Sequence, residues 1–534
     1  MARIVVIGSG VSGAHAALTL LERGFAVELW DVGGSEEAFP EPVATFHDLK
    51  SRLLDPVAYF LGSDLRALVP PAAPELMRYP PSRQFLVSER HALWGFTSET
   101  FVSYGSFARG GLANGWGANV LSFDENDVAD WPVSFDEMQA AYKTVCARIP
   151  IAGPSDDDLS PYLREVSPSQ PAVELTATDK RLLRNYARRR TGLNRDGVSL
   201  GRARLAVVTD PAREDACCYC DRCLWGCPRA SIYNPAISTL TQCHGHGGFR
   251  YRSKRFVVAL LASGGRVTGI RYLDTETSEL REEACDVVFL AAGALQTGAI
   301  FLRTLKQVRP DVAPETDGLM DTAFVKIPYL VLGSIGQPHE SRAFQFNRLI
   351  LGLIGAREGW PRYLHCELLH LTSLIYHPLI ERIPLDSRLS GRLFFSLKSA
   401  LGAASLFFPD KLTSHNRQIL LDGPGRWENV RLHYAETTEK EDYIRTGVRR
   451  VQSALGKLGC LVREPVRSPP GAALHYAGTV PMGRGFKRCD SKGRSNLFAN
   501  LYIADGAAFP SLPSKSLTLS LAAHATRVAL AARF

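Results

Sequence analysis

Residues 2–31 read ARIVVIGSGVSGAHAALTLLERGFAVELWD, and this stretch decides the fold. Its first part, residues 3–7, is apolar and β-branched, which is typical of a strand buried on both faces. Three glycines follow, and then a helical pattern that stops at Gly24. A second apolar run over residues 25–30 ends at Asp31. The order of strand, glycines, helix, strand and acid predicts the first βαβ unit of an α/β protein.

The three glycines have separate physical roles in such a unit. Gly8 makes the tight turn, Gly10 lets the backbone approach a pyrophosphate, and Gly13 lets the helix pack closely on the strand. The phosphates would lie at the helix N-terminus, where free N–H groups and the helix dipole favour negative charge. Asp31 is placed to accept hydrogen bonds from an adenosine ribose. The stretch predicts a Rossmann-like dinucleotide site, against the alternative of a glycine-rich turn that binds nothing.

Length and composition set the remaining bounds. A chain of 534 residues is long enough for two intertwined domains. The sequence is 45% hydrophobic and 22% charged, as in an ordinary globular protein. With 62 basic and 54 acidic residues the net charge is +8, and the basic residues are scattered. Nothing resembles a nucleic-acid module, so nucleic-acid binding is not expected.

The sequence predicts a cytoplasmic protein. The first strand begins at residue 3, which leaves no room for a targeting peptide. The longest charge-free apolar run in the middle of the chain, residues 399–408, is about half of what a bilayer span needs. Six of the eleven cysteines are dispersed, unlike a secreted disulfide framework, so a reducing compartment is expected.

Further along the chain, residues 33–93 are expected to be rich in loops. Residues 105–119 contain many glycines beside Trp116, which predicts that their backbone lies closely against a flat ligand. Ser134 is expected to cap a helix, with Glu137 completing a capping box. Residues 150–200 are expected to be irregular. Strands are predicted over residues 256–261, 266–272, 286–290 and 501–504, with Gly264-Gly265 as a hairpin turn and a final helix from about Thr518.

Several motifs in order resemble the glucose–methanol–choline (GMC) oxidoreductase family over nearly the whole chain. They are Gly8–Gly13, Arg109-Gly110-Gly111 with Trp116-Gly117, Trp131-Pro132, Phe289–Ala294, Leu474–Gly483 and Asn500–Pro510. The resemblance implies an α/β fold with a Rossmann-like FAD-binding domain and an intertwined α+β substrate domain. It implies that residues 1–130, 200–305 and 466–534 form the first domain, and that residues 131–199 and 306–465 form the second.

The resemblance also implies the residues that hold FAD. In some members a histidine before the tryptophan of the glycine loop carries the flavin covalently, but here that position is Gly115, so FAD is expected to be non-covalent. The implied cofactor-binding residues are Gly8, Gly10, Gly13, Asp31, Arg109, Gly110, Gly111, Asn114, Trp116, Ala292, Gly293, Asp505, Gly506 and Thr518.

Five cysteines lie within residues 217–227. Convergent thiolates suit an iron–sulfur cluster or zinc, and the alternative is a set of thiols without metal. The run resembles the cluster-binding segment in the catalytic subunit of bacterial FAD-dependent glucose dehydrogenases, which implies a 3Fe–4S or 4Fe–4S cluster. Cys217, Cys218, Cys223 and Cys227 match its spacing, and Cys220 is an additional thiol.

His475 is the candidate catalytic base, because an alcohol gives up a hydride only as its hydroxyl proton leaves. Without its motif this histidine would be read as an ordinary core or surface residue. Family members carry a second histidine or asparagine near the C-terminus, where this chain has Ser516. Serine can orient a substrate oxygen but cannot act as a base at neutral pH. The histidine at position 524 is expected to belong to the core.

These observations predict a FAD-dependent dehydrogenase that oxidises the CH–OH group of a sugar or another alcohol and passes electrons through the cluster to a protein acceptor. Two alternatives remain: a flavoenzyme of polysaccharide or natural-product biosynthesis with altered chemistry, and an electron-transfer or redox-sensing flavoprotein. Apolar runs in residues 349–408 suggest core packing, or else a greasy channel or peripheral membrane contact. The arginines near these runs would suit anionic groups, and they are Arg348, Arg357, Arg382, Arg388 and Arg392.

Overall fold

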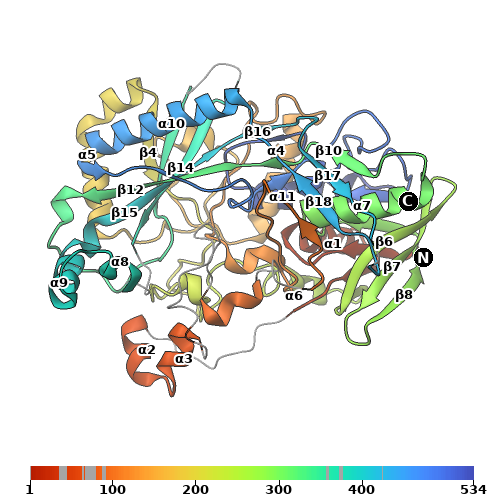
Figure 1. Ribbon diagram of the computed structural model, residues 1–534, viewed down its shortest axis with the longest axis horizontal. Helices are drawn as coiled ribbons and strands as arrows, with labels where there is room; N and C mark the ends of the chain where they lie inside the picture. Colours follow the sequence, from red (N-terminus) through yellow and green to blue (C-terminus); the bar gives the residue numbers. More distant parts are fainter. Residues whose placement is uncertain are drawn as a thin grey trace.

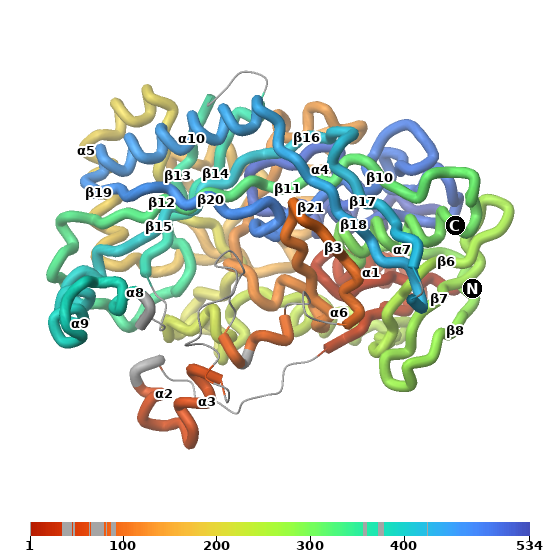
Figure 2. Tube along the Cα trace, viewed as in Figure 1, coloured from red at the N-terminus to blue at the C-terminus, as the bar shows by residue number. Residues whose placement is uncertain are grey.

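The computed structural model describes residues 2–34, 45–62, 65, 80–86, 92–355, 360–371, 377–423 and 425–534 (Figures 1 and 2). The helices of this part of the chain are α1 Val11–Glu22, α2 Phe46–Arg52, α3 Pro56–Leu61, α4 Phe135–Arg148, α5 Ala177–Arg195, α6 Thr239–His244, α7 Ala294–Val308, α8 His377–Glu381, α9 Ser387–Leu397, α10 Thr438–Lys457 and α11 Thr518–Ala531.

The strands are β1 Ile4–Ile7, β2 Val27–Trp30, β3 Phe96–Thr97, β4 Val198–Arg202, β5 Phe249–Arg252, β6 Arg255–Ser263, β7 Arg266–Asp274, β8 Glu279–Ala284, β9 Val287–Leu290, β10 Glu315–Asp317, β11 Met320–Asp321, β12 Ala323–Val331, β13 Leu349–Ile354, β14 Tyr363–His370, β15 Leu401–Phe408, β16 Asp410–Lys411, β17 Arg417–Leu420, β18 Val430–His433, β19 Cys460–Val462, β20 Val466–Arg467, β21 Tyr476–Ala477, β22 Leu501–Ile503 and β23 Ser511–Leu512.

The predicted βαβ unit lies in a five-stranded sheet with the order β22-β9-β1-β2-β5, in which all the pairs are parallel. The four residues of β1 are all buried, as expected for a strand covered on both faces. Helix α1 packs on the sheet between α11 and α6. The sheet therefore joins the N-terminal segment, the middle of the chain and the C-terminal segment, and both chain ends lie beside it (Figure 1).

A second sheet has the order β19-β12-β15-β14-β13-β4, its strands run antiparallel, and β20 also pairs with β12. One face packs against α5 and α10 through a core that includes Leu364, Cys366 and Leu368 of β14. Helices α5 and α10 lie on the same side of this sheet in Figure 1. The opposite face of β14 carries the alternate residues, which point toward the first sheet. The division of the chain into two domains at the predicted boundaries stays a prediction.

Most of the strands predicted from sequence are present, including the hairpin at Gly264-Gly265 between β6 and β7. The expectation that residues 150–200 are irregular is wrong, because α5 spans nineteen of them. Thr176 and Asp179 form a capping box at its start, and Leu182, Tyr186 and Leu193 are buried on one face. The many arginines of its outer face obscured this apolar stripe in the sequence.

Two other expectations are corrected in detail. Ser134 caps α4 by accepting a hydrogen bond from the backbone N–H of Glu137, but the reciprocal side-chain bond of a capping box is missing. The segment expected to be loop-rich contains α2 and α3 in its described part, and each begins with a side-chain cap, Thr45 and Asp55 respectively.

No helix in the described ranges is long and apolar enough to cross a membrane. Of the arginines considered for anionic groups, Arg348 is buried and paired with Asp179, its Nε lying 2.5 Å from a carboxylate oxygen. It is therefore not available to a membrane surface. Arg357 lies outside the described residues, whereas Arg382, Arg388 and Arg392 are exposed around α8 and α9.

Candidate active site

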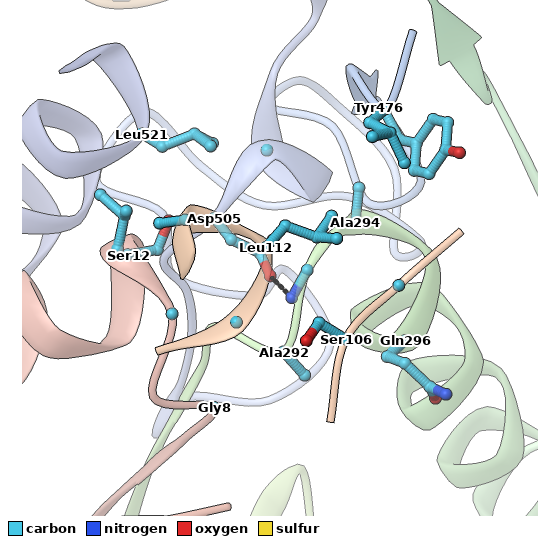
Figure 3. A pocket seen from close by; sticks show the side chains of 18 of the residues that line it. Gly8, Ser12, Ser106, Leu112, Ala292, Ala294, Gln296, Tyr476, Asp505 and Leu521 are labelled. Carbon is cyan, nitrogen blue, oxygen red and sulfur yellow. Dashed lines mark hydrogen bonds between the residues drawn. The ribbon is translucent and has the colours of Figure 1, made fainter. Parts of the chain in front are cut away.

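A single cavity of about 420 Å³ extends from the start of α1 to the second sheet. Four parts of the chain surround it: the β1–α1 turn, the glycine loop before α4, the β9–α7 turn, and the C-terminal segment (Figure 3). Figure 3 shows Gly8, Asp505 and Ala292 around the same space, although they are far apart in sequence. A cavity of this size lies in the range for small-molecule sites.

The end of the cavity at α1 suits an anionic group. Gly10 begins α1 without a side-chain cap, and the first turn contains no acidic residue, so its N–H groups are free to face a ligand. A Cβ built on Gly10 would meet no atom within 4 Å, whereas one on Gly8 would lie 2.4 Å from the carbonyl oxygen of Ala291. Gly8 also has a φ of +100°. The close approach of Ala291 and the positive φ therefore both require glycine at position 8.

Asp31 stands at the end of β2 and lines the same part of the cavity. The Ser9 hydroxyl donates to its carboxylate, and the backbone N–H of Gly33 donates to Oδ1 at 2.9 Å. Burial raises the pKa of Asp31 to about 7 despite these donors. Ser9 also accepts a hydrogen bond from the backbone N–H of Gly110, so the acid, the turn and the glycine loop are held together.

Most of the predicted cofactor residues line this cavity, and three do not. Those that line it are Gly8, Gly10, Asp31, Gly110, Gly111, Trp116, Ala292, Gly293, Asp505, Gly506 and Thr518. Gly13 packs instead, since a Cβ there would lie 1.8 Å from the carbonyl oxygen of Gly8. Arg109 lies over the ring of Tyr251, and Asn114 braces the glycine loop by donating to the carbonyl oxygens of Arg109 and Gly111, both at 2.8 Å.

Asp505 connects the C-terminal segment to the β9–α7 turn. Its Oδ2 accepts hydrogen bonds from the backbone N–H of Gly293 at 2.8 Å and from the Thr297 hydroxyl at 2.6 Å, while Oδ1 accepts from the N–H of Ala507 at 2.9 Å. Burial raises the pKa of Asp505 to about 6. The carboxyl group therefore positions two glycine turns against the cavity, which is a structural role for this predicted residue.

The turn at Gly471, which is held by hydrogen bonds, positions His475 at the cavity. Gly471 has a φ of +91°, and a Cβ there would lie 1.9 Å from the carbonyl oxygen of Val102, so this position requires glycine. Its N–H donates to Asp321 at 2.7 Å, and its carbonyl oxygen accepts from the Tyr476 hydroxyl at 2.6 Å. Since Tyr476 is anchored in this way, the residue before it, His475, is directed toward the cavity that it lines.

The surroundings of His475 keep its ring neutral. Burial, with a smaller contribution from the neighbouring His365, lowers the pKa of His475 to about 4. The Nδ1 atom is buried and has no hydrogen-bond partner among the described residues. The ring of Phe407 lies between the two histidines, 5.4 Å from His475 and 6.0 Å from His365 by ring centroids. A neutral imidazole in this position can accept a proton.

Ser516 lies in the same cavity as His475. Its neighbour Lys515 is buried and points the other way, with Nζ 2.6 Å from Asp127 and 3.0 Å from Asp124. Ser514 accepts from the backbone N–H of His365 at 3.2 Å and donates to the carbonyl oxygen of Tyr363. These anchors fix the loop to β14, and the Ser516 hydroxyl makes no hydrogen bond within the described part of the chain, so it is open to a ligand.

Sequence reasoning missed a polar group on β14. Glu367 lines the cavity, and its Oε1 accepts a hydrogen bond from Asn119 at 2.8 Å and lies 3.5 Å from Nε2 of His365. The signal was the alternation along β14, in which Tyr363, His365 and Glu367 share one face and apolar residues share the other. The sequence did not show which face would meet the cofactor domain.

Residues 418–525 match the family model for GMC oxidoreductases. The match covers the C-terminal segment of the chain and agrees there with the resemblance seen in the sequence. His475, Asp505 and Ser516 all lie within the matched residues, so the family match covers the candidate catalytic groups. No curated protein matches the sequence.

Solved structures give the same fold over the whole chain. Pyridoxine 4-oxidase from Mesorbium loti is similar with a TM-score of 0.62 and 14% identity, covering 99% of both chains. An FAD-dependent oxidoreductase from Chaetomium thermophilum, solved with a bound fragment, is similar with a TM-score of 0.59 and 12% identity, covering 99% of this chain and 98% of the other. At these identities the likeness shows the fold, which confirms the predicted α/β class with its Rossmann-like parallel sheet.

The family match in the C-terminal segment supports an FAD-dependent oxidoreductase, and the residues around the cavity fit that cofactor. The uncapped N-terminus of α1 and the open space at Gly10 suit a pyrophosphate, and Asp31 suits a ribose. Helix α11 also begins at the cavity without a side-chain cap, at Thr518. The cavity contains Gly115 where a covalent link would need histidine, which is compatible with releasable FAD.

The cysteine loop, residues 217–227, places its five thiols in one neighbourhood. Each of Cys217, Cys220 and Cys223 is close enough to other thiols of the loop for their charges to interact. The N–H of Ser231 donates to Cys227 Sγ at 3.2 Å. Burial raises the pKa of Cys217, Cys220 and Cys223, and the nearby backbone amides of Tyr219, Arg222 and Gln345, in that order, oppose this shift. Tyr219 and Asp221 have positive φ values of 53° and 58°, which re-orient the backbone of the loop.

Among the residues that the structure describes, no three His, Cys, Asp or Glu side chains converge as they would around one metal ion. A zinc ion with Zn–S bonds of about 2.3 Å would require such close sulfurs. An iron–sulfur cluster spans a larger volume and is held by thiolates that stand further apart, often with N–H donors to sulfur. The loop therefore lacks the geometry of a single-ion site.

The cysteine loop and the cavity share a hydrophobic cluster. Cys217 and Cys223 pack against the same hydrophobic cluster as Trp116, which also lines the cavity. The indole N–H of Trp116 donates to the carbonyl oxygen of Tyr233 at 2.8 Å and fixes the ring in place. One hydrophobic cluster therefore links the thiol-rich loop to the wall of the cavity that contains Trp116.

Proposed function

We propose that this protein is a FAD-dependent dehydrogenase that oxidises a CH–OH group of a sugar or another alcohol. The observation that carries the proposal is that His475, held neutral by burial, shares one cavity with the uncapped start of α1 and with the open hydroxyl of Ser516. FAD would supply the acceptor for the hydride. His475, Ser516 and the residues implied for the cofactor keep these roles as part of the proposal.

Four side chains of the protein would have separate roles in the reaction. A ring nitrogen of His475 accepts the substrate hydroxyl proton as the carbon–hydrogen bond breaks. The Ser516 hydroxyl donates to the same substrate oxygen and orients it. Glu367, fixed by Asn119, accepts a hydrogen bond from another polar group of the substrate. Phe407 closes the wall between the histidines and limits water at the reacting carbon.

We further propose that the cysteine loop holds an iron–sulfur cluster that carries electrons out of the active site to a separate acceptor protein. The proposal is supported by the N–H of Ser231 that donates to Cys227 Sγ and by the backbone amides near Cys217, Cys220 and Cys223. It is also supported by the hydrophobic cluster that the loop shares with Trp116. The resemblance implies Cys218 in place of Cys220, so the two ligand sets differ at one position.

The test of the proposed function is an anaerobic reduction experiment. Purified holoprotein is mixed with a panel of sugars and other alcohols while the flavin absorbance is followed. At least one alcohol is expected to bleach the flavin and to yield the corresponding carbonyl compound. A protein whose flavin is reduced by a redox partner protein but by no alcohol would instead be an electron-transfer flavoprotein.

The first prediction concerns the attachment of FAD. Because Gly115 replaces the histidine that would carry a covalent link, acid precipitation is expected to release all of the flavin into the supernatant. The measurement is the flavin absorbance of supernatant and pellet. Colour retained in the pellet would show a covalent bond, and a preparation with no flavin at all would contradict the cofactor.

The second prediction concerns Glu367, which touches the cavity but not the proton transfer. Glu367→Gln keeps the size and removes the charge, so it is expected to raise the substrate KM about tenfold, or by about 1.4 kcal/mol, with little change in kcat. Glu464→Gln, at an exposed site away from the cavity, is the matched control. A large fall in kcat at constant KM would show that Glu367 belongs to the proton-transfer machinery.

A further inference from the structure

The surface around α9 lies outside the candidate active site and is rich in apolar side chains. Large apolar side chains are exposed there in a group: Leu385 is 51% exposed, Leu389 47%, Leu393 43% and Phe395 57%. Asp386 caps the helix, and Ser390 and Phe394 are buried on its inner side. Helices α8 and α9 project together at one end of the molecule, beyond the second sheet (Figure 1).

The apolar group extends to a neighbouring segment. The short turn at Leu332–Ser334 packs against residues Lys398–Ala400, which follow α9 directly. The backbone N–H of Gly336 donates to the carbonyl oxygen of Ser396 at 2.8 Å. Leu332 and Ile335 are exposed on this turn, so the apolar side chains of several segments form one surface. We call it the α9 surface, and it consists of Leu332, Ile335, Leu379, Leu385, Leu389, Leu393 and Phe395 with Arg382, Arg388 and Arg392.

The α9 surface has three arginines, and the acidic residues nearest to them in sequence are Glu381 and Asp386, of which Asp386 caps α9. Arg388 and Arg392 lie four residues apart and form a row next to that of Leu389 and Leu393. Arg382, Arg388 and Arg392 are all exposed, and within the described residues none of their guanidinium groups pairs with a carboxylate. A partner that covers leucines and also neutralises several arginines must be apolar and anionic at the same time.

We propose that the α9 surface docks on an anionic lipid membrane. Leucine side chains enter the boundary between headgroups and acyl chains, and the long arginine side chains extend to the phosphates. The chain would thereby bind as a peripheral protein through an interfacial helix. No charged residue of the proposed active site belongs to this surface.

The orientation on the membrane follows from the neighbours of α9. Lys398, at the end of α9, and Asp221 of the cysteine loop are close enough for their charges to interact. Lys50 of α2 is close to the same lysine. Tyr59 of α3 stacks on Trp225 of the cysteine loop, with ring centroids 5.1 Å apart. Docking through α9 would therefore bring the cysteine loop near the membrane surface.

Vesicle flotation tests this inference without any turnover, so its result is independent of the proposed function. Yellow holoprotein is expected to float with vesicles of phosphatidylcholine and phosphatidylglycerol, to float much less with phosphatidylcholine alone, and to be released by high salt. Arg388→Ser/Arg392→Ser is expected to weaken partitioning about 25-fold, from about fivefold for each arginine. Leu389→Ser/Leu393→Ser is expected to weaken it by more than about tenfold.

The matched control is Leu280→Ser/Leu530→Ser, which removes two leucines that are also exposed but lie on β8 and α11. It is expected to float like the wild type, and the flavin content of each variant reports its folding. The inference is overturned if the wild type fails to float with anionic vesicles, or if both α9 variants float normally. It is also overturned if sedimentation shows a dimer that the Leu389→Ser/Leu393→Ser variant abolishes while no vesicle binds.

Discussion

His475→Ala is expected to lower the rate of flavin bleaching by a good substrate by about 10²–10⁴-fold, which is roughly 3–5 kcal/mol of barrier. The reason is that His475 is the one histidine among the described residues that line the cavity. FAD should stay bound, since His475 is not one of the residues proposed to hold it. The measurement is single-turnover anaerobic bleaching in a stopped-flow instrument.

Ser516→Ala is the matched comparison, because the hydroxyl orients the substrate without accepting its proton. Its expected cost is that of one neutral hydrogen bond, about 0.5–1.5 kcal/mol, or up to about tenfold in rate. Equal losses in the two variants would show that Ser516 does more than orient. A normal bleaching rate in His475→Ala would contradict the assignment of the base and the alcohol-oxidation mechanism with it.

If His475 is the base, the rate of flavin bleaching must fall as the pH is lowered. Burial lowers the pKa of His475 to about 4, so the reactive neutral form is fully present at neutral pH and is lost as the pH falls through that value. Bleaching is therefore expected to be flat from about pH 8 to 5 and to fall about tenfold per unit at lower pH. A fall centred near the ordinary histidine value of about 6.5 would show that His475 is not desolvated during the reaction.

Cys223→Ser is expected to abolish the iron and acid-labile sulfide of anaerobically prepared protein while FAD stays bound. Cys223 is half-buried and is close enough to Cys217, Cys220 and Cys227 for their charges to interact, so loss of this ligand leaves the cluster open to solvent. Flavin bleaching by substrate should be unchanged, whereas reduction of an external protein acceptor should fall by at least about a hundredfold, or 2.7 kcal/mol. Iron analysis and the EPR spectrum are the measurements.

Two further variants decide between the ligand sets. If the N–H donors mark the ligands, Cys220→Ser loses the cluster and Cys218→Ser keeps it, and the reverse holds if the spacing of the resemblance is right. Cys146→Ser is the control, because Cys146 lies outside the loop and is comparably buried. Stoichiometric zinc without iron in the wild type would contradict the cluster and favour a single-ion site that rearranges on binding.

The sequence by itself determined the local parts of this protein. The buried strand, the glycines and the helix of residues 2–31 fix one another's geometry over a short stretch, so Gly8, Gly13 and Asp31 were interpretable without a structure. The hairpin at Gly264-Gly265 and the start of α11 followed from turn and helix signals for the same reason. The thiol-rich loop and the motif around His475 were also visible as contiguous patterns.

Only the tertiary structure decided which distant residues meet at the cavity. Glu367 reaches it because the strand order places β14 beside β15 and because Ser514 binds β14 to the loop of Ser516, and neither fact is encoded in a local pattern. The amphipathic face of α5 was hidden by its arginines until packing against the second sheet identified it. Sequence patterns specify elements through nearest-neighbour sterics and periodicity, whereas the meeting of elements depends on long-range packing that no short window contains.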